Sequence, residues 1–130
     1  MKNKIILVTI LLLFVIYGHA QDTIPVADTN KVLPEFRGGD VAYNKYSVKQ
    51  VKYPQEAKEK AHQGTVIVAF TVEADGSITH VHAVKEVEGA PELTVEAIRF
   101  ISAMPLWQPG TINGKPTSME SAKGLHFRLQ

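Results

Sequence analysis

The sequence predicts a two-layer α+β domain in which helices cover one face of a three-stranded antiparallel sheet. Residues 65–72 form an apolar segment, and Asp75-Gly76 after it is a strong hairpin signal. A predicted helix then returns the chain, so a last strand over 117–129 can pair antiparallel with the first. The first strand is the most apolar and belongs in the centre. The expected spatial order of the strands is therefore 2-1-3.

Alternating apolar residues define the first two strands. The buried face of the first consists of Val66, Val68, Phe70 and Val72. The second strand breaks the alternation, because Ile78 lies on one face while Val81 and Ala83 lie on the other. A β-bulge near Thr79-His80 would turn all three side chains inward, and we expect one there.

Two helices are expected before the first strand. One lies within 41–51. Its core-facing residues are expected to be Ala42, Tyr46 and Val48. The other spans 54–63, because Pro54 suits a first turn and Gly64 is a common helix end.

A third helix is predicted over 91–103, between Pro91 in its first turn and Pro105 as its stop. Its apolar stripe consists of Leu93, Ala97, Phe100, Ile101 and Met104. Its polar residues, expected to lie mostly away from that stripe, are Glu92, Glu96 and Arg99.

The start of the chain predicts export. Lys2 and Lys4 precede an apolar run of 13 residues, and Gly18-His19-Ala20 suits a signal peptidase that cuts after Ala20. The run is shorter than the roughly 18 residues of a membrane-spanning helix, although a retained anchor is the alternative. We therefore expect a signal peptide over 1–20, a flexible polar lead-in over 21–33 and one domain over 34–130, located in the periplasm.

Composition excludes several classes of function. Removal of residues 1–20 leaves 12 basic and 13 acidic side chains, and no basic run interleaves with aromatic residues, so nucleic acid is not an expected partner. The chain has no cysteine, which excludes disulfides, a thiol nucleophile, a cysteine zinc site and a lipid-modified cysteine.

Histidine and serine patterns do not predict an enzyme. His80 and His82 share a strand face, and His62 or His126 could add a third metal ligand, but order 2-1-3 separates His82 from His126 by the central strand. We interpret the pair as solvent-facing and expect no metal or cofactor. No serine lies in a nucleophile-elbow pattern, so no catalytic residue is predicted.

Four motifs in order give the chain a family resemblance. They are PEFRGG at 34–39, YPQEA at 53–57, GTVIVAFTVEADGSI at 64–78 and MPLWQPGTINGKP at 104–116. With them, residues 34–129 resemble the C-terminal domain of TonB, the periplasmic end of the outer-membrane energy transducer. The resemblance implies the fold derived above.

The resemblance also implies a function. Members of the family bind the Ton box, an extended peptide of outer-membrane receptors, as an extra strand beside the third strand. The implied peptide-binding residues are Gln50, Lys52, Tyr53, Pro54, Met119, Ser121, Lys123, Leu125 and Phe127. Proline at Ser121 or Lys123 should weaken binding, provided that its N–H faces the peptide. The implied partners are TonB-dependent receptors and, if the N-terminal segment is retained, inner-membrane proton-channel proteins.

Two questions stay open at this point. Trp107, between Pro105 and Pro109, is expected to pack as an apolar plug that fixes the connection to the last strand, and direct peptide contact is the alternative. The exposed edge could also serve an envelope assembly or adaptor role, by pairing with a second copy in a homodimer or with another protein, without energy coupling.

Overall fold

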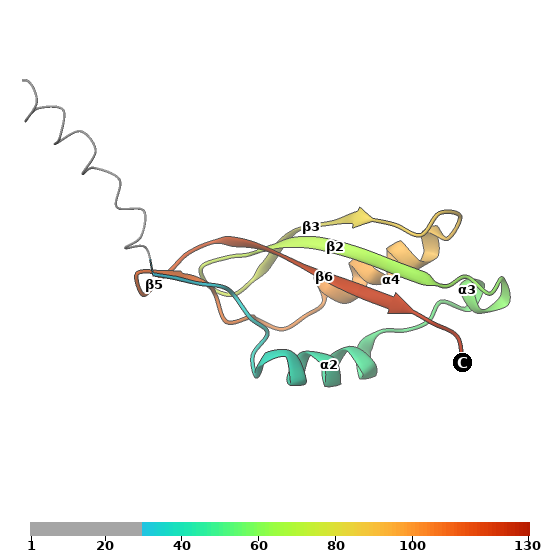
Figure 1. Cartoon of the computed structure of the whole chain (residues 1–130), viewed down its shortest axis with the longest axis horizontal. Coiled ribbons are helices and arrows are strands. Elements are labelled where there is room, and N and C mark those ends of the chain that lie inside the picture. Colours follow the sequence, from blue (N-terminus) through green and yellow to red (C-terminus); the bar gives the residue numbers. More distant parts are fainter. Residues whose placement is uncertain (1–29) are drawn as a thin grey trace, which may run out of the picture.

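The computed structural model describes residues 30–130 (Figure 1). The main sheet contains β2 (Gly64–Val72), β3 (Ile78–Lys85) and β6 (Met119–Phe127). Both β3 and β6 pair antiparallel with β2, in the order β3-β2-β6, which confirms the predicted order 2-1-3. The predicted signal peptide over 1–20 and the lead-in up to residue 29 lie outside the described residues.

The hairpin between β2 and β3 forms at the predicted turn. The Glu73 N–H donates to the Ser77 carbonyl at 2.9 Å, and the Gly76 N–H donates to the Glu73 carbonyl at 2.8 Å. Gly76 has a φ of +88°, which glycine adopts without strain. The Ser77 N–H also donates to the Asp75 carboxylate at 2.9 Å, so both residues of the Asp-Gly pair shape the turn.

The predicted bulge in β3 is confirmed. Ala69 pairs with His82 and Thr71 with Thr79, so β3 has one extra residue in this stretch, and His80 has a positive φ of 52°. Because of this bulge, the three apolar side chains that break the alternation in the sequence all pack against the core and are half-buried: Ile78, Val81 and Ala83. A second irregularity, opposite Ile67 and Val68, was not predicted.

Helix α4 (Pro91–Ser102) covers the inner face of the sheet. All five residues of its predicted apolar stripe are buried. The inner face of β2 is buried as well, with Val66, Val68, Phe70 and Val72 at most 1% exposed. The expectation for Glu96 is wrong, because this carboxylate residue is only 7% exposed. The buried carboxylate accepts hydrogen bonds from Arg99 of the same helix and from the Lys52 N–H outside it, as described below.

The two earlier helices differ from expectation. Helix α3 (Gln55–Glu59) is shorter than the predicted 54–63, because the chain leaves the helix at Lys60 and Ala61 takes a left-handed conformation. Pro54 is its N-cap residue, and Gly64 begins β2 instead of ending the helix.

Helix α2 (Gly39–Gln50) turns a different residue inward than predicted. Tyr43 is buried, and Ala42 and Tyr46 are partly buried as expected. Val48 is 84% exposed, so its predicted place in the core is wrong. Val48 lies two positions after Tyr46, which puts the two side chains on nearly opposite sides of a helix.

A second, small sheet contains β1 (Lys31–Val32), β4 (Thr111–Ile112) and β5 (Lys115–Pro116) in the order β1-β4-β5. Asn113 and Gly114 turn the chain between β4 and β5 with positive φ values of 51° and 78°, the conformation that an Asn-Gly pair favours. Strand β1 was not predicted, because its residues fall within the expected lead-in over 21–33. Both residues of β1 are exposed, so their sequence shows no alternation of apolar and polar residues that would indicate a strand.

Trp107 fills the centre of the molecule, which confirms its predicted structural role. It is 1% exposed, and its ring lies 5.1 Å from the ring of Phe70 and 6.0 Å from that of Phe36. The backbone N–H of Trp107 donates to the Gly76 carbonyl at 2.8 Å. Trp107 therefore joins the hairpin to the connection that follows α4. Within residues 30–130, no helix has both the length and the apolar character needed to cross a membrane.

Candidate functional site

Strand β6 has one free edge. All nine of its residues pair with β2 in a continuous register, from Gly64 opposite Phe127 to Val72 opposite Met119. In the part of the chain that the structure describes, no strand pairs with the other edge of β6. A free edge exposes backbone N–H and C=O groups that can pair with another extended chain.

The hairpin determines which backbone groups face this edge. Glu73 and Ser77 form a hydrogen-bonded closing pair, so the backbone of Glu73 points toward β3. In an antiparallel strand the direction alternates, so the backbone of Val72 points toward β6. Val72 lies opposite Met119, and the register between β2 and β6 is continuous. The backbone N–H and C=O groups of the odd-numbered β6 residues therefore point toward β2. The residues that direct their N–H and C=O to the free edge are Glu120, Ala122, Gly124 and His126.

The five residues that were predicted on this strand are all odd-numbered. Met119, Leu125 and Phe127 are buried at 9%, 6% and 5% exposure, and Ser121 and Lys123 are partly exposed. Their N–H groups face β2, so the condition attached to the proline test at Ser121 or Lys123 is not met. Proline at either position would disturb the sheet itself.

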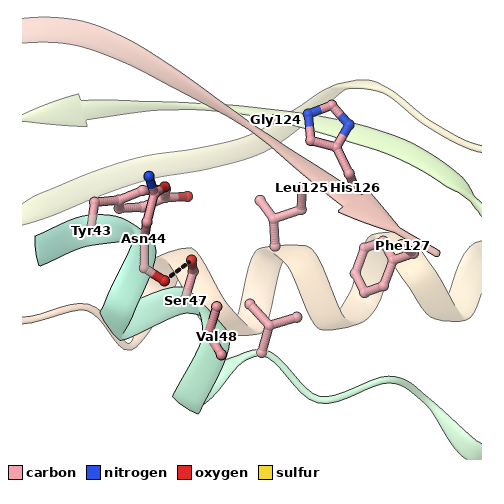
Figure 2. Close-up of a pocket in the computed structure, with 9 residues that line it drawn as sticks. Tyr43, Asn44, Ser47, Val48, Gly124, Leu125, His126 and Phe127 are labelled. Carbon is pink, nitrogen blue, oxygen red and sulfur yellow. Dashed lines mark hydrogen bonds between the residues drawn. The ribbon is translucent and has the colours of Figure 1, made fainter. Parts of the chain in front are cut away.

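A groove runs between β6 and α2, with a volume of about 350 Å³. Figure 2 shows the two walls, with Leu125 and Phe127 reaching from β6 toward the helix. The helix side and the residue that follows it contribute Tyr43, Asn44, Ser47, Val48 and Val51. Gly124 and His126 also line the groove, so backbone groups of the free edge open onto it.

Lys123 connects the two walls at one end of the groove. Its ammonium lies 4.4 Å from the centre of the Tyr43 ring and 3.6 Å from an Asp40 carboxylate oxygen. Burial raises the pKa of Tyr43 to about 12, so its phenol is neutral at physiological pH. A cation over a neutral aromatic face is a favourable contact and helps to hold α2 beside the sheet.

Four predicted residues belong to the segment at the other end of the site: Gln50, Lys52, Tyr53 and Pro54. The Tyr53 ring lies edge-on to that of Phe127 at 5.6 Å, and its hydroxyl donates to the His62 carbonyl. The Lys52 N–H donates to Glu96 at 2.6 Å, and the Gln50 carbonyl accepts from Arg99 at 2.9 Å. The fold therefore brings this segment next to the C-terminal end of β6.

Sequence reasoning missed the helix wall of the groove. Tyr43, Asn44, Ser47 and Val51 were not among the predicted site residues, although they lie beside Leu125 and Phe127. The spacing of Tyr43 and Tyr46 by three residues was the available signal, because it places two aromatic rings on one helix face.

The histidine pair on β3 is arranged differently from a metal site. His80 lies in the bulge, and Nδ1 of His82 is 2.8 Å from the His80 carbonyl. Across residues 30–130, no three side chains of His, Asp or Glu are close enough together to hold a metal ion.

The fold and its free edge define an α+β domain of the kind that can extend its sheet with a partner strand. The family model of the Gram-negative bacterial TonB protein C-terminal matches residues 49–129, and the chain belongs to this family. The match begins at Lys49, so nearly all of α2 precedes it.

Two solved structures are similar to this chain. The TonB C-terminal domain of Helicobacter pylori has 22% sequence identity and a TM-score of 0.50, over 67% of this chain and 77% of that one. The TonB C-terminal domain of Pseudomonas aeruginosa has 23% identity and a TM-score of 0.45, over 61% and 78%. The Helicobacter structure supports the fold. Comparison with curated proteins gives no match.

Proposed function

We propose that this protein binds an extended peptide of TonB-dependent outer-membrane receptors by adding it as a strand to the free edge of β6. One observation carries the proposal: four β6 residues direct their backbone groups away from the sheet, beside a groove with an apolar floor. An edge of this kind gives affinity through main-chain hydrogen bonds, and pockets for alternate side chains give selectivity.

The geometry favours an extended ligand over a helical one. Residues 120–126 offer backbone partners at every second position, a spacing that only an extended chain can match. Side chains on one face of the added strand would enter the groove beside Leu125 and Phe127. Those on the other face would lie over Ala122 and Gly124, which are small and leave room for larger partners.

The remaining parts of the proposal concern location and energy. The export signal predicted from the sequence supports a periplasmic location. A part in TonB-dependent transport, without enzyme activity, rests on the family. If the N-terminal segment is retained in the inner membrane, proton-channel proteins there are the proposed partners. Family membership supports both statements.

The test is an amide-resolved NMR titration with peptides from the periplasmic ends of the host's outer-membrane receptors. We expect the largest shifts in Glu120, Ala122, Gly124 and His126, and smaller ones at 50–54. Gly124 provides a matched pair of variants, because a Cβ there would meet only Thr65 and His126 atoms at 3.7 and 3.9 Å. Gly124→Ala keeps the edge N–H, whereas Gly124→Pro removes it.

Gly124→Ala should bind within about twofold of the wild type, and Gly124→Pro at least about tenfold more weakly, since one main-chain bond is lost and the ring obstructs its neighbours. Equal affinity of both variants, with the fold intact, would contradict the proposal. If peptide has no effect and the mass in solution rises with concentration, the edge pairs with a second copy instead.

A further inference from the structure

We propose that Glu96 and Arg99 of α4 are positioning residues for the binding groove, because they hold the end of α2 and the segment 50–54 in place. The inference deepens the proposed function and rests on it. Neither residue lines the α2–β6 groove, so each would act through the backbone that it fixes.

Glu96 makes the contact to the extended segment. One carboxylate oxygen accepts from the Lys52 N–H at 2.6 Å, and the same oxygen accepts from Arg99 at 2.8 Å. The other oxygen accepts from Arg99 Nε at 2.6 Å. Lys52 lies between α2 and α3, outside regular structure, so its N–H has no partner from a helix or sheet. The carboxylate supplies one.

Arg99 makes the contact to α2. Its guanidinium donates to the carbonyl of Gln50, the last residue of the helix, at 2.9 Å. Carbonyls at a helix C-terminus lack partners within the helix, and a cation is favourable there. Since Glu96 holds the guanidinium through two parallel hydrogen bonds, the direction of this contact is also fixed.

Burial makes Glu96 an unusual residue at this place. Glu96 is 7% exposed on a helix whose neighbouring residues Ala97 and Phe100 belong to the apolar core. The Arg99 side chain is 44% exposed, and an ion pair of this partly exposed kind often adds little net stability, so stability alone does not account for it. What the pair adds is a fixed backbone position at Gln50 and at Lys52.

Gln50 and Lys52 are each adjacent in the chain to a residue that lines the groove or packs on its wall. Val51 lies between them and lines the groove, and Tyr53, one residue further, packs on Phe127. If the pair is removed, the segment samples other positions and only a fraction of molecules presents the groove correctly. The apparent Kd then rises by the inverse of that fraction.

The experiment compares three variants of the full chain with the wild type. Glu96→Ala removes the contact to the Lys52 N–H and the contact that orients Arg99. Glu96→Gln keeps an oxygen that can accept from the Lys52 N–H. Arg99→Lys keeps the positive charge but loses the two parallel hydrogen bonds of the guanidinium to Glu96. Val95→Ala is the control, because Val95 lies next in the helix and is 68% exposed. The readouts are peptide Kd, hydrogen exchange of each amide and the urea midpoint.

We expect Glu96→Ala to weaken peptide binding about tenfold, as it would if about one molecule in ten kept the segment in place. Exchange of the Lys52 amide should become faster, while amides of Val68 and Phe70 in the central strand keep their protection. Glu96→Gln should recover part of the affinity, and Val95→Ala should match the wild type. If Glu96→Ala does not fold, Glu96→Gln and Arg99→Lys provide the same comparison at smaller amplitude.

Two results would overturn the inference while the proposed function stands. One is wild-type affinity in the Glu96 variants, and the other is an equal loss of protection at Lys52 and in β2, which would mark a purely structural role. Absence of peptide binding by the wild type would overturn the proposed function, and this inference with it.

Discussion

Gly76 shows how much of this fold depends on one residue. Its φ of +88° suits the turn, and a Cβ there would lie 2.2 Å from the Trp107 carbonyl oxygen. The Trp107 N–H also donates to the Gly76 carbonyl, so two distant backbone segments touch at this point. Glycine is needed both for the turn and for the close approach.

We predict that Gly76→Ala lowers the free energy of unfolding by about 3 kcal/mol, since left-handed strain and a backbone clash add together. Gly89→Ala is the matched control, because Gly89 has a φ of +77° and no atom within 4 Å of a Cβ. It should cost only about 1 kcal/mol. Urea unfolding of both variants gives the comparison, and equal losses would contradict the role of the Trp107 contact.

Helix α2 is the element on which the candidate groove depends. Tyr43 is its one buried residue, with ring contacts to Phe36 at 5.7 Å and Phe100 at 6.2 Å. Val48 points outward at the rim of the groove. The helix is therefore held to the core mainly through the side of Tyr43 and Tyr46, and its other side is open to solvent.

This arrangement predicts opposite outcomes for two substitutions in α2. Tyr43→Ala should reduce the free energy of unfolding by about 3 kcal/mol, because it empties a buried aromatic site. Val48→Ala should change it by less than about 0.5 kcal/mol, as expected for an exposed residue. Thermal or urea unfolding distinguishes the two. A larger loss for Val48→Ala would restore the orientation that the sequence analysis expected.

Carboxylates connect the elements of the whole molecule, and four of them have a lowered pKa: Glu73, Asp75, Glu92 and Glu96. For Glu73 the main cause is the hydrogen bond from Thr79, followed by one from Ser118. For Glu96 desolvation acts most strongly and raises the pKa, but the Arg99 and Lys52 contacts together outweigh it. These groups join the hairpin, α4 and the 50–54 segment to their neighbours.

The whole domain should therefore lose stability in acid. A carboxyl whose pKa is lower in the folded state binds fewer protons there than in the unfolded chain, so its contribution is present above the ordinary values of 4.5 and 3.8. It is lost as the pH falls through the lowered values. We expect the urea midpoint to be lower at pH 3 than at pH 7, and Glu73→Gln to reduce that difference. A midpoint that is unchanged or higher at pH 3 would contradict the argument.

The candidate site was predictable in outline only. The resemblance pointed to the last strand and to residues 50–54, and the fold brings Tyr53 and Phe127 of these two segments into contact. Which backbone groups face outward depends on the hydrogen-bonded pair at Glu73 and Ser77, together with an uninterrupted register. One residue of slippage would exchange the two sets, and side-chain patterns do not reveal it.

The sequence by itself determined the three strands of the main sheet, the hairpin, the bulge near His80 and the apolar stripe of α4, because alternation and helical spacing are local consequences of backbone geometry. Only the tertiary structure decided that Glu96 is buried and that α2 turns Tyr43 inward and forms a wall of the groove. A carboxylate is buried only where donors meet it. Here one donor is Arg99 of the same helix, which also binds the end of α2, and the other is the Lys52 N–H, 44 residues away, which only the tertiary structure brings close. A short helix with few apolar residues can take several orientations, and packing against Phe36 and Phe100 selects one of them.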